Sequence, residues 1–221
     1  MAKTIKHKDN LPYFGEDALL AIAANKKFSD MIFELLSEKA PNEHESKLFE
    51  TILNISIDHG EDTPSAVEVI KASKEGKTVS EAVSAGILQI NDSHGGAIEP
   101  AMELFYKIKK EGLGTKGVVE DYLEEGKRMP GFGHRIYEVD PRSQLLFKLA
   151  KEEGLSLEFV DLAIQIENEL KSQKGKALPV NIDGSIAAIL CSFGWDAKLG
   201  KAVFLAARTP GLCGQYLNHK R

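Results

Sequence analysis

The chain has 221 residues, of which 43% are hydrophobic and 28% are charged, and its formal net charge is −5. This composition is typical of a globular protein, and the negative net charge argues against binding to nucleic acid or to an anionic membrane through bulk charge. No apolar run approaches the roughly 20 residues that span a bilayer, so we expect neither a nucleic-acid partner nor a membrane partner.

Helical periodicity dominates the sequence from end to end. In chain order, we expect helices at 15–27, 29–39, 43–58, 63–75, 79–90, 95–110, 116–126, 141–153, 157–172, 182–193 and 197–217. Thr78 and Glu81 have the spacing of a capping box, and Asp140 precedes a proline as an N-cap often does. Clear alternating β patterns are missing, and only Lys3–Lys6 and Pro179–Ile182 could be extended. The sequence therefore predicts an all-α fold.

Two features favour a cytoplasmic protein. The N-terminal segment contains lysines but no apolar stretch after them, so it lacks the pattern of a signal peptide. Cys191 and Cys213 stand 22 residues apart, without the CxxC spacing of a redox or metal site. We therefore expect both cysteines to be packing residues in a reducing compartment.

Two glycine-containing segments imitate nucleotide-binding motifs. Residues 112–117 satisfy GxGxxG, but they follow a predicted helix, whereas the dinucleotide-binding motif follows a strand. The GKT sequence at 76–78 looks like the end of a P-loop, yet Lys71 stands where the first glycine should be. Both segments are predicted to be turns, and the sequence shows no ATP site.

Three of the six histidines lie in turns that contain glycine: His59 in IDHG, His94 in NDSHGG and His134 in PGFGHR. Glycine lets the backbone approach a ligand closely, and histidine titrates near neutral pH. Each histidine could instead simply cap a helix, and a zinc site is a further alternative. Because the three lie far apart without an HExxH or HxH spacing, we expect no metal ion. Surface positions are expected for His7, His44 and His219.

Other charged residues also stand where they could meet a ligand. The segment Lys127–Lys148 holds five basic and two acidic residues in an acidic protein, and its glycine loop with arginines suits phosphate or carboxylate ligands. Asp183 lies in an NIDG turn after apolar residues, where desolvation could make it a base. Arg208 lies in an otherwise apolar helix, and a bound carboxylate is one candidate partner for it.

The sequence resembles the citrate synthase superfamily in five segments that occur in the same order: SIDHGEDTPSA, NDSHGGAIEPA, PGFGHRIYEVDPR, NIDGSIAAIL and LAARTPGLCGQYLNHKR. The resemblance runs from about residue 30 to the C-terminus. The last two segments look most like the citrate-synthase-homology module of ATP-citrate lyase and the stand-alone citryl-CoA lyases. The resemblance implies a two-lobed helical subunit that works as a homodimer. We expect a large lobe of about 1–94 plus 186–221 and a small lobe of about 95–185.

The resemblance implies catalytic roles for His94, His134 and Asp183. His94 would hydrogen-bond the thioester enolate, Asp183 would exchange the α-proton of the acetyl group, and His134 would stand at the oxaloacetate carbonyl or the citryl hydroxyl. A carbon next to a thioester is far less acidic than a carboxyl group, so Asp183 can remove its proton only if the enolate is stabilised in the same step. A neutral histidine at the start of a helix can provide such stabilisation.

The resemblance also implies which residues bind the two parts of the substrate. Residues that would hold the dicarboxylate are His59, Arg142 and Arg208. Residues that would meet coenzyme A are Pro130, Gly131, Phe132 and Gly133, whose backbone would wrap the adenine, and Arg128 and Arg135, which would meet phosphates. The superfamily usually has a further arginine downstream of Arg208 that reaches into the partner subunit's site. Because the sequence ends at Arg221, we expect weak binding of free citrate and oxaloacetate.

The activity that fits these residues best is cleavage of citryl-CoA to acetyl-CoA and oxaloacetate, with coenzyme A entering as a thioester. A separate citrate–CoA ligase would then have to supply citryl-CoA, because no ATP site is visible. Two alternatives stay open. One is a compact citrate synthase that condenses acetyl-CoA with oxaloacetate. The other is a catalytically silent homologue that only binds acyl-CoA or scaffolds a complex.

Overall fold

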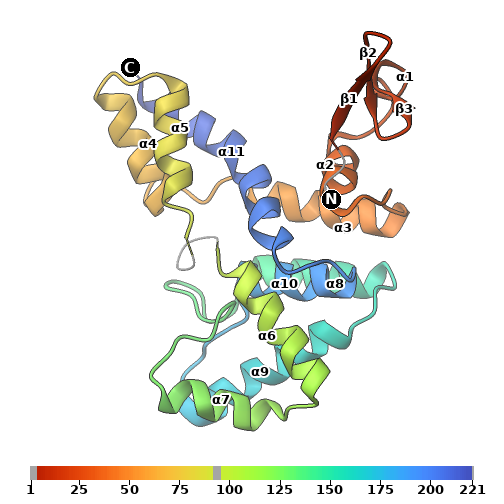
Figure 1. Ribbon diagram of the computed structural model, residues 1–221. Helices are drawn as coiled ribbons and strands as arrows, with labels where there is room; N and C mark the ends of the chain where they lie inside the picture. The colour runs from red at the N-terminus through yellow and green to blue at the C-terminus, as the bar shows by residue number, and fades with distance from the viewer. Residues whose placement is uncertain (1–3, 92–95, 221) are drawn as a thin grey trace. The chain divides into compact units, whose positions relative to one another are not determined.

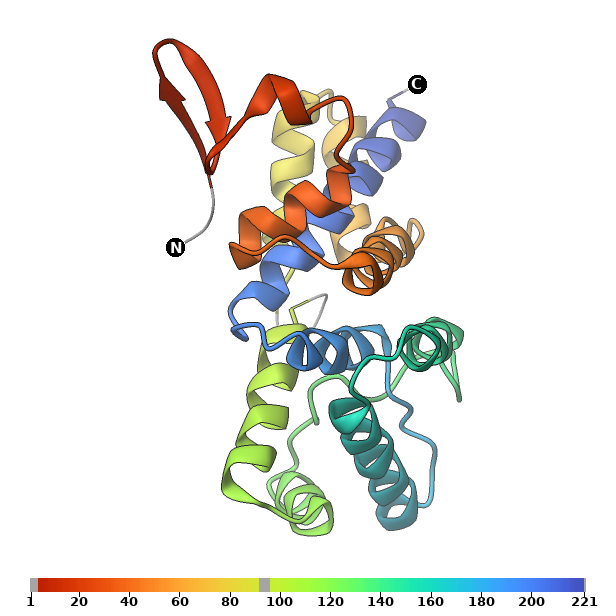
Figure 2. The same ribbon diagram turned by 90° about the vertical axis from the view of Figure 1, so that its right-hand side faces the viewer.

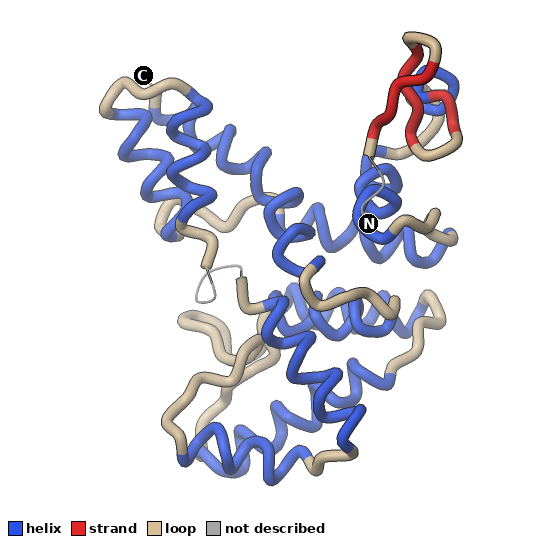
Figure 3. Tube along the Cα trace, viewed as in Figure 1, coloured by secondary structure: helices blue, strands red, loops and turns tan. Residues whose placement is uncertain are grey.

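Helices make up most of this computed structural model, which describes residues 4–91 and 96–220 (Figures 1 and 3). The longer helices are α2 (Phe28–Ser37), α3 (Glu43–Ser56), α4 (Pro64–Lys74), α5 (Val79–Leu88), α6 (Ile98–Glu111), α7 (Thr115–Glu124), α8 (Pro141–Glu152), α9 (Glu158–Lys174), α10 (Ile182–Ser192) and α11 (Leu199–His219). Each of them overlaps a helix predicted from the sequence, so the helical character of the fold is confirmed. Within the described residues, no helix is both long and apolar enough to cross a membrane.

The N-terminal segment corrects the sequence prediction, because a small sheet occupies residues 5–18, beyond the Lys3–Lys6 segment that could be extended, and little of the helix expected at 15–27 is present. Strands β1 (Ile5–Lys8) and β2 (Leu11–Phe14) pair antiparallel, as Figure 2 shows in red, and a short β3 (Asp17–Ala18) pairs with β2. Only one turn of helix, α1 (Leu19–Ile22), follows. The fold is therefore mostly helical rather than all-α.

The turn between β1 and β2 explains why the hairpin forms. Asp9 has φ of 49° and Asn10 has φ of 63°, so both central residues are left-handed. This is the backbone of a two-residue type I′ hairpin, and Asp and Asn tolerate it better than most other non-glycine residues. The strands have only four residues each, which is too short for a clear alternating pattern to appear in the sequence.

The chain divides into two compact units, residues 1–51 and 52–221. In the first unit the core includes the buried Phe33 and Phe49, whose rings meet edge to face with centroids 5.3 Å apart. The second unit contains every residue predicted for the functional site. The two lobes expected from the resemblance, with boundaries near 94 and 185, stay a prediction.

Helices α4, α5 and α11 pack together through one cluster of buried side chains in the second unit. Its members are Val69, Ala82, Val83, Leu212 and Tyr216. The predicted capping box at the start of α5 is confirmed, because Glu81 N donates to Thr78 Oγ1 and Thr78 N donates to Glu81 Oε2. Two caps of this kind satisfy backbone N–H groups that the first helical turn leaves unpaired.

Helix α10 forms the core of the remaining part of this unit, with α6, α8 and α9 packed around it. Nine of its eleven residues are buried. Burial of each large aliphatic side chain stabilises the fold by roughly 1.5–3 kcal/mol, so this helix is a strong anchor. Asp183 lies in its first turn, and the fold therefore carries a carboxyl group into the protein interior.

Candidate active site

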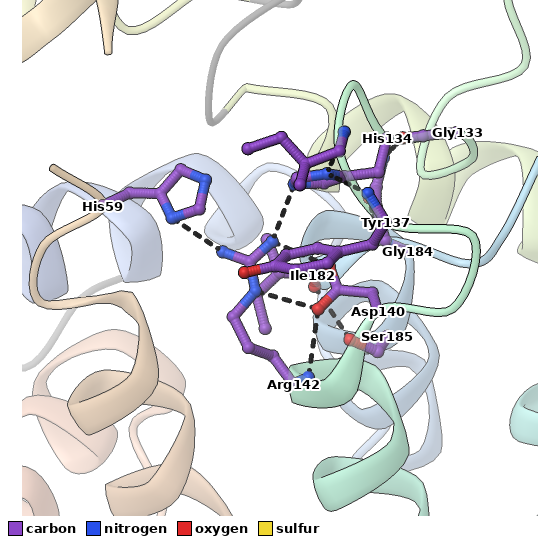
Figure 4. A network of polar contacts seen from close by, with 11 residues as sticks. His59, Gly133, His134, Tyr137, Asp140, Arg142, Ile182, Gly184 and Ser185 are labelled. Atoms are coloured by element: carbon purple, nitrogen blue, oxygen red, sulfur yellow. Dashed lines mark hydrogen bonds and ion pairs between the residues drawn. The ribbon is translucent and has the colours of Figure 1, made fainter. Parts of the chain in front are cut away.

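The Arg142 side chain is the centre of a polar network that draws in three separate segments of the chain (Figure 4). Asp140, the predicted N-cap of α8, accepts hydrogen bonds from Arg142 N at 3.0 Å, Nε at 2.9 Å and Nη2 at 2.7 Å. Burial acts to raise the pKa of Asp140, but the bonds from Arg142 hold that pKa below its usual value. The carboxylate therefore stays ionised and fixes the guanidinium in place.

The two terminal nitrogens of the Arg142 guanidinium each also face a histidine. Arg142 Nη1 donates to His59 Nδ1 at 3.3 Å, since arginine cannot accept a hydrogen bond. Arg142 Nη2 lies 3.3 Å from His134 Nε2. The predicted residues His59, His134 and Arg142 are thus brought together by the structure.

The backbone fixes which nitrogen of His134 carries the proton. Its Nδ1 accepts from the backbone N–H groups of Ile136, at 3.1 Å, and Tyr137, at 3.2 Å. A nitrogen that accepts carries no proton, so the proton of the neutral ring is on Nε2. The N–H of His134 and the Nη2 of Arg142 are therefore two neighbouring donors that cannot bond to each other. Together they can bind one ligand oxygen.

Both histidines are biased toward the neutral form. Burial, followed by the charge of Arg142, lowers the pKa of His59. Burial also lowers the pKa of His134. Asp140 acts to raise this pKa, and the charge of Arg142 acts to lower it. A neutral imidazole can donate a hydrogen bond to an oxygen without having to release a proton first.

Asp183 is buried, with 8% of its surface exposed. Burial raises the pKa of this carboxyl to about 6, although the charges of Arg142 and Arg208 favour the carboxylate. The N–H of Ala97, at the start of α6, also favours the charged form. A carboxyl group with a pKa near neutrality can take and return a proton, which is what general acid–base catalysis requires.

The loop that carries His134 is bound directly to the start of α10. Asn181 N donates to Gly131 O at 3.0 Å, and Gly133 N donates to Pro179 O at 2.7 Å. The Asn181 side chain also donates to Gly133 O at 3.0 Å and accepts from Gly184 N at 3.1 Å. These bonds hold the His134 loop against the first turn of the helix that carries Asp183.

Arg208 is buried in α11, with 3% of its surface exposed. Its Nε donates to Ser56 O at 2.8 Å, and its guanidinium lies over the Phe204 ring at 4.7 Å. Burial lowers the pKa of Arg208, against the opposite effects of Asp58 and Asp183. Its Nη1 has no hydrogen-bond partner within the described residues, which fits the predicted role in holding a carboxylate.

The predicted coenzyme A residues fall into two groups. Arg128, Phe132, Gly133 and Arg135 line a cavity of about 520 Å³ that His134 also lines. Pro130 is half-buried, and Gly131 is buried against Gly184, and neither lines this cavity. Arg135 Nη2 also pairs with Asp62 Oδ2 at 2.6 Å, so its charge already has a protein partner.

Sequence reasoning missed several residues of the site. Lys174 and Lys176 line the same cavity as Arg128 and Lys127, and only the latter two belong to the basic segment predicted to meet a ligand. Both missed lysines lie far along the chain from that segment. Gln215 donates to Asp58 Oδ2 at 2.9 Å, and although it lies within the last of the five family-like segments, no role was predicted for it.

Two predictions stay open at this site. His94 lies outside the described residues, so its predicted role is untested. Among the residues that are described, no group of three or more His, Cys, Asp or Glu side chains is arranged to hold a metal ion. The expected absence of a metal stays a prediction.

Comparison with known proteins identifies several relatives. The family described as "Citrate synthase, C-terminal domain" matches residues 2–221. A probable ATP-citrate synthase of Dictyostelium discoideum is 29% identical over 230 residues, which cover 96% of this chain and 37% of the relative. The chain thus spans little more than a third of the length of that curated relative.

Two solved structures cover the whole chain. Citryl-CoA lyase from Hydrogenobacter thermophilus is 33% identical, with a TM-score of 0.92 and 86% of its own chain covered. A mutant of ATP citrate lyase from Methanosaeta concilii, in complex with (3S)-citryl-CoA, is 25% identical, with a TM-score of 0.91 and 39% of its chain covered. The similarity to the first of these extends over nearly the full length of both chains.

Proposed function

The chain belongs to the citrate synthase family, and on that basis we propose that it cleaves citryl-CoA to acetyl-CoA and oxaloacetate. The observation that carries this proposal is the pairing of two N–H donors, His134 Nε2 and Arg142 Nη2, together with a buried carboxyl, Asp183, whose pKa responds to the charge of Arg142. The full-length similarity to a citryl-CoA lyase supports it.

The carbon–carbon cleavage needs a place for the charge on the citryl hydroxyl oxygen. His134 would take the hydroxyl proton at Nε2, which enters this step without a proton, and the resulting N–H, together with Arg142, would donate to the carbonyl oxygen of oxaloacetate as the carbon–carbon bond breaks and its electron pair forms the enolate. Donors that are already oriented toward a developing charge are among the largest contributions to catalysis. The backbone N–H groups that donate to His134 Nδ1 favour the ring with its proton on Nε2. This is the form of His134 that would donate to the carbonyl oxygen of oxaloacetate after the bond has broken.

The other product of bond breaking is the enolate of acetyl-CoA, which must gain a proton at carbon. Asp183 would supply that proton, because its raised pKa makes the acid form accessible near neutral pH. His94 would donate a hydrogen bond to the enolate oxygen, as the family resemblance implies. In the condensation direction Asp183 would remove the same proton, so one set of residues serves both directions.

The dicarboxylate part of the substrate would be held by His59, Arg142 and Arg208. The unpaired Nη1 of the buried Arg208 supports this role. A buried polar group without a partner costs on the order of 1–3 kcal/mol, and a substrate carboxylate would remove that cost. Binding of the substrate would thus satisfy a group that the protein alone leaves unsatisfied.

The coenzyme A part would occupy the cavity of about 520 Å³ next to His134. Lys127, Arg128, Lys174 and Lys176 line it, and clustered cations of this kind suit the phosphates of coenzyme A. The backbone of the Pro130–Gly133 loop would contact the adenine. The shared lining residue His134 would place the thioester end of the ligand beside the reacting groups.

Several wider features remain proposals of ours. A separate citrate–CoA ligase would supply citryl-CoA, and the similarity to ATP-citrate synthases supports this proposal. We also propose a homodimer in the cytoplasm. The alternative activity, condensation of acetyl-CoA with oxaloacetate, would use the same site.

The proposed function is tested by incubating the purified protein with citryl-CoA in one experiment and with acetyl-CoA plus oxaloacetate in another. We expect oxaloacetate to form in the first experiment. Its formation is measured as the oxidation of NADH when malate dehydrogenase reduces the oxaloacetate. Release of free coenzyme A in the second experiment, faster than any citryl-CoA cleavage, would indicate a citrate synthase. Binding of acetyl-CoA without turnover in either experiment would indicate a silent homologue.

A further inference from the structure

The ring of Tyr137 lies against both donors of the proposed oxygen-binding pair. It stacks on the His134 imidazole, with ring centroids 4.5 Å apart and planes inclined by 28°. The Arg142 guanidinium carbon lies 5.9 Å from the centroid of the same ring. Figure 4 shows the phenol ring beside these two side chains. The mechanism described above gives this ring no role.

Tyr137 is less exposed than its neighbours in the chain. In the segment 135–139, Tyr137 is half-buried and the other four residues are exposed. The side chain of Tyr137 is therefore the one in this segment that packs into the site. Its backbone N–H also donates to His134 Nδ1 at 3.2 Å, so the position of the ring and the position of that donor are linked.

The stacking contact adds to the two backbone hydrogen bonds in limiting rotation of the His134 ring. Rotation of an imidazole about its χ2 torsion is broad, because that torsion joins a tetrahedral to a planar carbon. A ring lying parallel to the imidazole limits this rotation, and His59 limits it from another direction, with centroids 5.9 Å apart and planes at 77°. The direction of the Nε2–H bond depends on that rotation.

We propose that Tyr137 is a positioning residue, whose aromatic ring keeps the N–H of His134 and the Nη2 of Arg142 directed at one ligand oxygen. This inference rests on the proposed function for its catalytic consequence. It assigns the effect to the ring and not to the phenol hydroxyl. Phenylalanine at position 137 should therefore preserve the orientation of the two donors, whereas an aliphatic side chain should not.

The first test compares Tyr137→Phe with Tyr137→Leu in the cleavage of citryl-CoA. Misplacement of a catalytic group by about 1 Å can cost about a hundred-fold in rate, so we expect kcat of the leucine variant to fall roughly ten- to hundred-fold. Its KM should change little, and the phenylalanine variant should stay within about two-fold of the wild type. Val139→Ala, a change at an exposed position of the same segment, is the matched control.

The second test does not depend on any reaction. The ¹⁵N chemical shifts of labelled histidine in the ligand-free protein report the tautomer and pKa of each ring. We expect the His134 signals of Tyr137→Phe to match the wild type, and those of Tyr137→Leu to move toward a mixture of tautomers with a changed pKa. Tyr137→Met provides a second aliphatic variant if the leucine variant does not fold.

The outcomes separate the inference from the function on which it rests. If the wild-type protein does not cleave citryl-CoA, the proposed function fails, and the histidine spectra still test the position of the ring. If Tyr137→Leu keeps both the wild-type kcat and the wild-type His134 signals, Tyr137 is not a positioning residue. An equal loss of kcat in the phenylalanine and leucine variants would assign the role to the hydroxyl and overturn the proposal.

Discussion

Gly184 in the first turn of α10 lies so close to Gly131 that a Cβ atom added to Gly184 would stand 2.2 Å from the Gly131 carbonyl oxygen. No side chain fits in that space, and both partners at the contact are backbone. The contact joins the loop of His134 to the helix of Asp183, which are far apart in the sequence. Two glycines thus fix the distance between two groups of the proposed mechanism.

The first prediction follows from this contact. Gly184→Ala should force the Pro130–His134 loop away from α10, because the new methyl group would clash with Gly131 O. Overpacking of this kind costs roughly 1–3 kcal/mol. We expect a lower free energy of unfolding in urea and a loss of citryl-CoA cleavage. Gly117→Ala is the control, since Gly117 lies in α7 with open space around it. That change should keep activity and stabilise the protein by roughly 0.5–1 kcal/mol. Equal stability of both variants would show that the contact can relax.

Much of the helical fold could be predicted from the sequence, because helix periodicity and caps are local signals. The capping box of Thr78 and Glu81 is an example, and the N-cap Asp140 is another. The hairpin was missed because its strands are short and because the left-handed pair Asp9 and Asn10 was not interpreted as a turn. The Asp-Asn pair is itself a usable turn signal, even where the first strand, IKHK, is not apolar.

The composition of the site could be predicted only in part, since its contacts join distant segments. His59, His134 and Arg142 were expected to share a ligand, and the structure brings them together. The role of Asp140 as an anchor for Arg142 could not be inferred, because an N-cap aspartate usually has no second function. Lys174 and Lys176 likewise join Arg128 only through tertiary packing.

The second prediction concerns Asp183 as an acid–base group. Asp183→Asn should fold and bind ligands, but it should lose proton exchange at the acetyl carbon by roughly 10²–10⁴ in rate. Exchange of the acetyl protons of acetyl-CoA with deuterated solvent, followed by NMR, measures this step without cleavage. Near-wild-type exchange in the variant would remove Asp183 from the proposed mechanism.

The third prediction concerns the same carboxyl and the stability of the fold. Its pKa of about 6 in the folded protein lies above the ordinary value of 3.8, so folding favours the protonated form. Ionised Asp183 therefore costs stability, and this cost grows as pH rises from about 4 to above 6. Asp183→Asn should raise the melting temperature clearly more at about pH 8 than at about pH 4.5. A lower melting temperature of the variant at the higher pH would contradict the assigned pKa shift.

The fourth prediction concerns the ion pair between Asp140 and Arg142. Asp140→Asn keeps a good N-cap residue but leaves the partly buried guanidinium without its charge partner, which should cost roughly 3–5 kcal/mol. The pKa of Asp140 is lowered in the folded protein, so its contribution is present above the ordinary pKa and is lost as pH falls through the folded value. Urea unfolding at neutral pH should therefore show a large difference from the wild type. The difference should shrink in acid, and an undiminished difference there would assign the loss to packing.

The fifth prediction concerns the basic cavity. Replacement of Arg128, Lys174 or Lys176 by glutamine should raise the KM for citryl-CoA. The increase should be about ten-fold where the lost side chain made a charge-assisted hydrogen bond to a phosphate. The salt dependence of that KM should also weaken. Arg135→Gln should have a smaller effect, because Arg135 is paired with Asp62. Lys148, an exposed lysine that pairs with Glu152, supplies the control variant, Lys148→Gln. An unchanged KM in the three cavity variants would mean that the cluster is a solvated surface.

The last prediction concerns Arg208 and the dicarboxylate. Arg208→Met keeps much of the buried apolar volume but removes the unpaired Nη1, so the substrate carboxylate would lose a charged hydrogen-bond partner. We expect oxaloacetate affinity to fall about ten- to hundred-fold, which corresponds to the cost of leaving a carboxylate without its partner. Isothermal titration calorimetry with oxaloacetate, in the presence and absence of coenzyme A, measures this directly.

Binding of coenzyme A alone should be the same in Arg208→Met and in the wild type, because Arg208 does not line the basic cavity. Lys198→Gln, at an exposed position just before α11, is the control for a lost positive charge near the same helix. Arg208→Met removes one buried charge and leaves Asp58, Asp183 and Ser56 O without it, so a lower free energy of unfolding is expected, and circular dichroism selects the temperature at which the variant is folded for the titration. If that folded variant binds oxaloacetate as tightly as the wild type, the carboxylate is held elsewhere, and Arg208 is only a structural residue that ties α11 to Ser56.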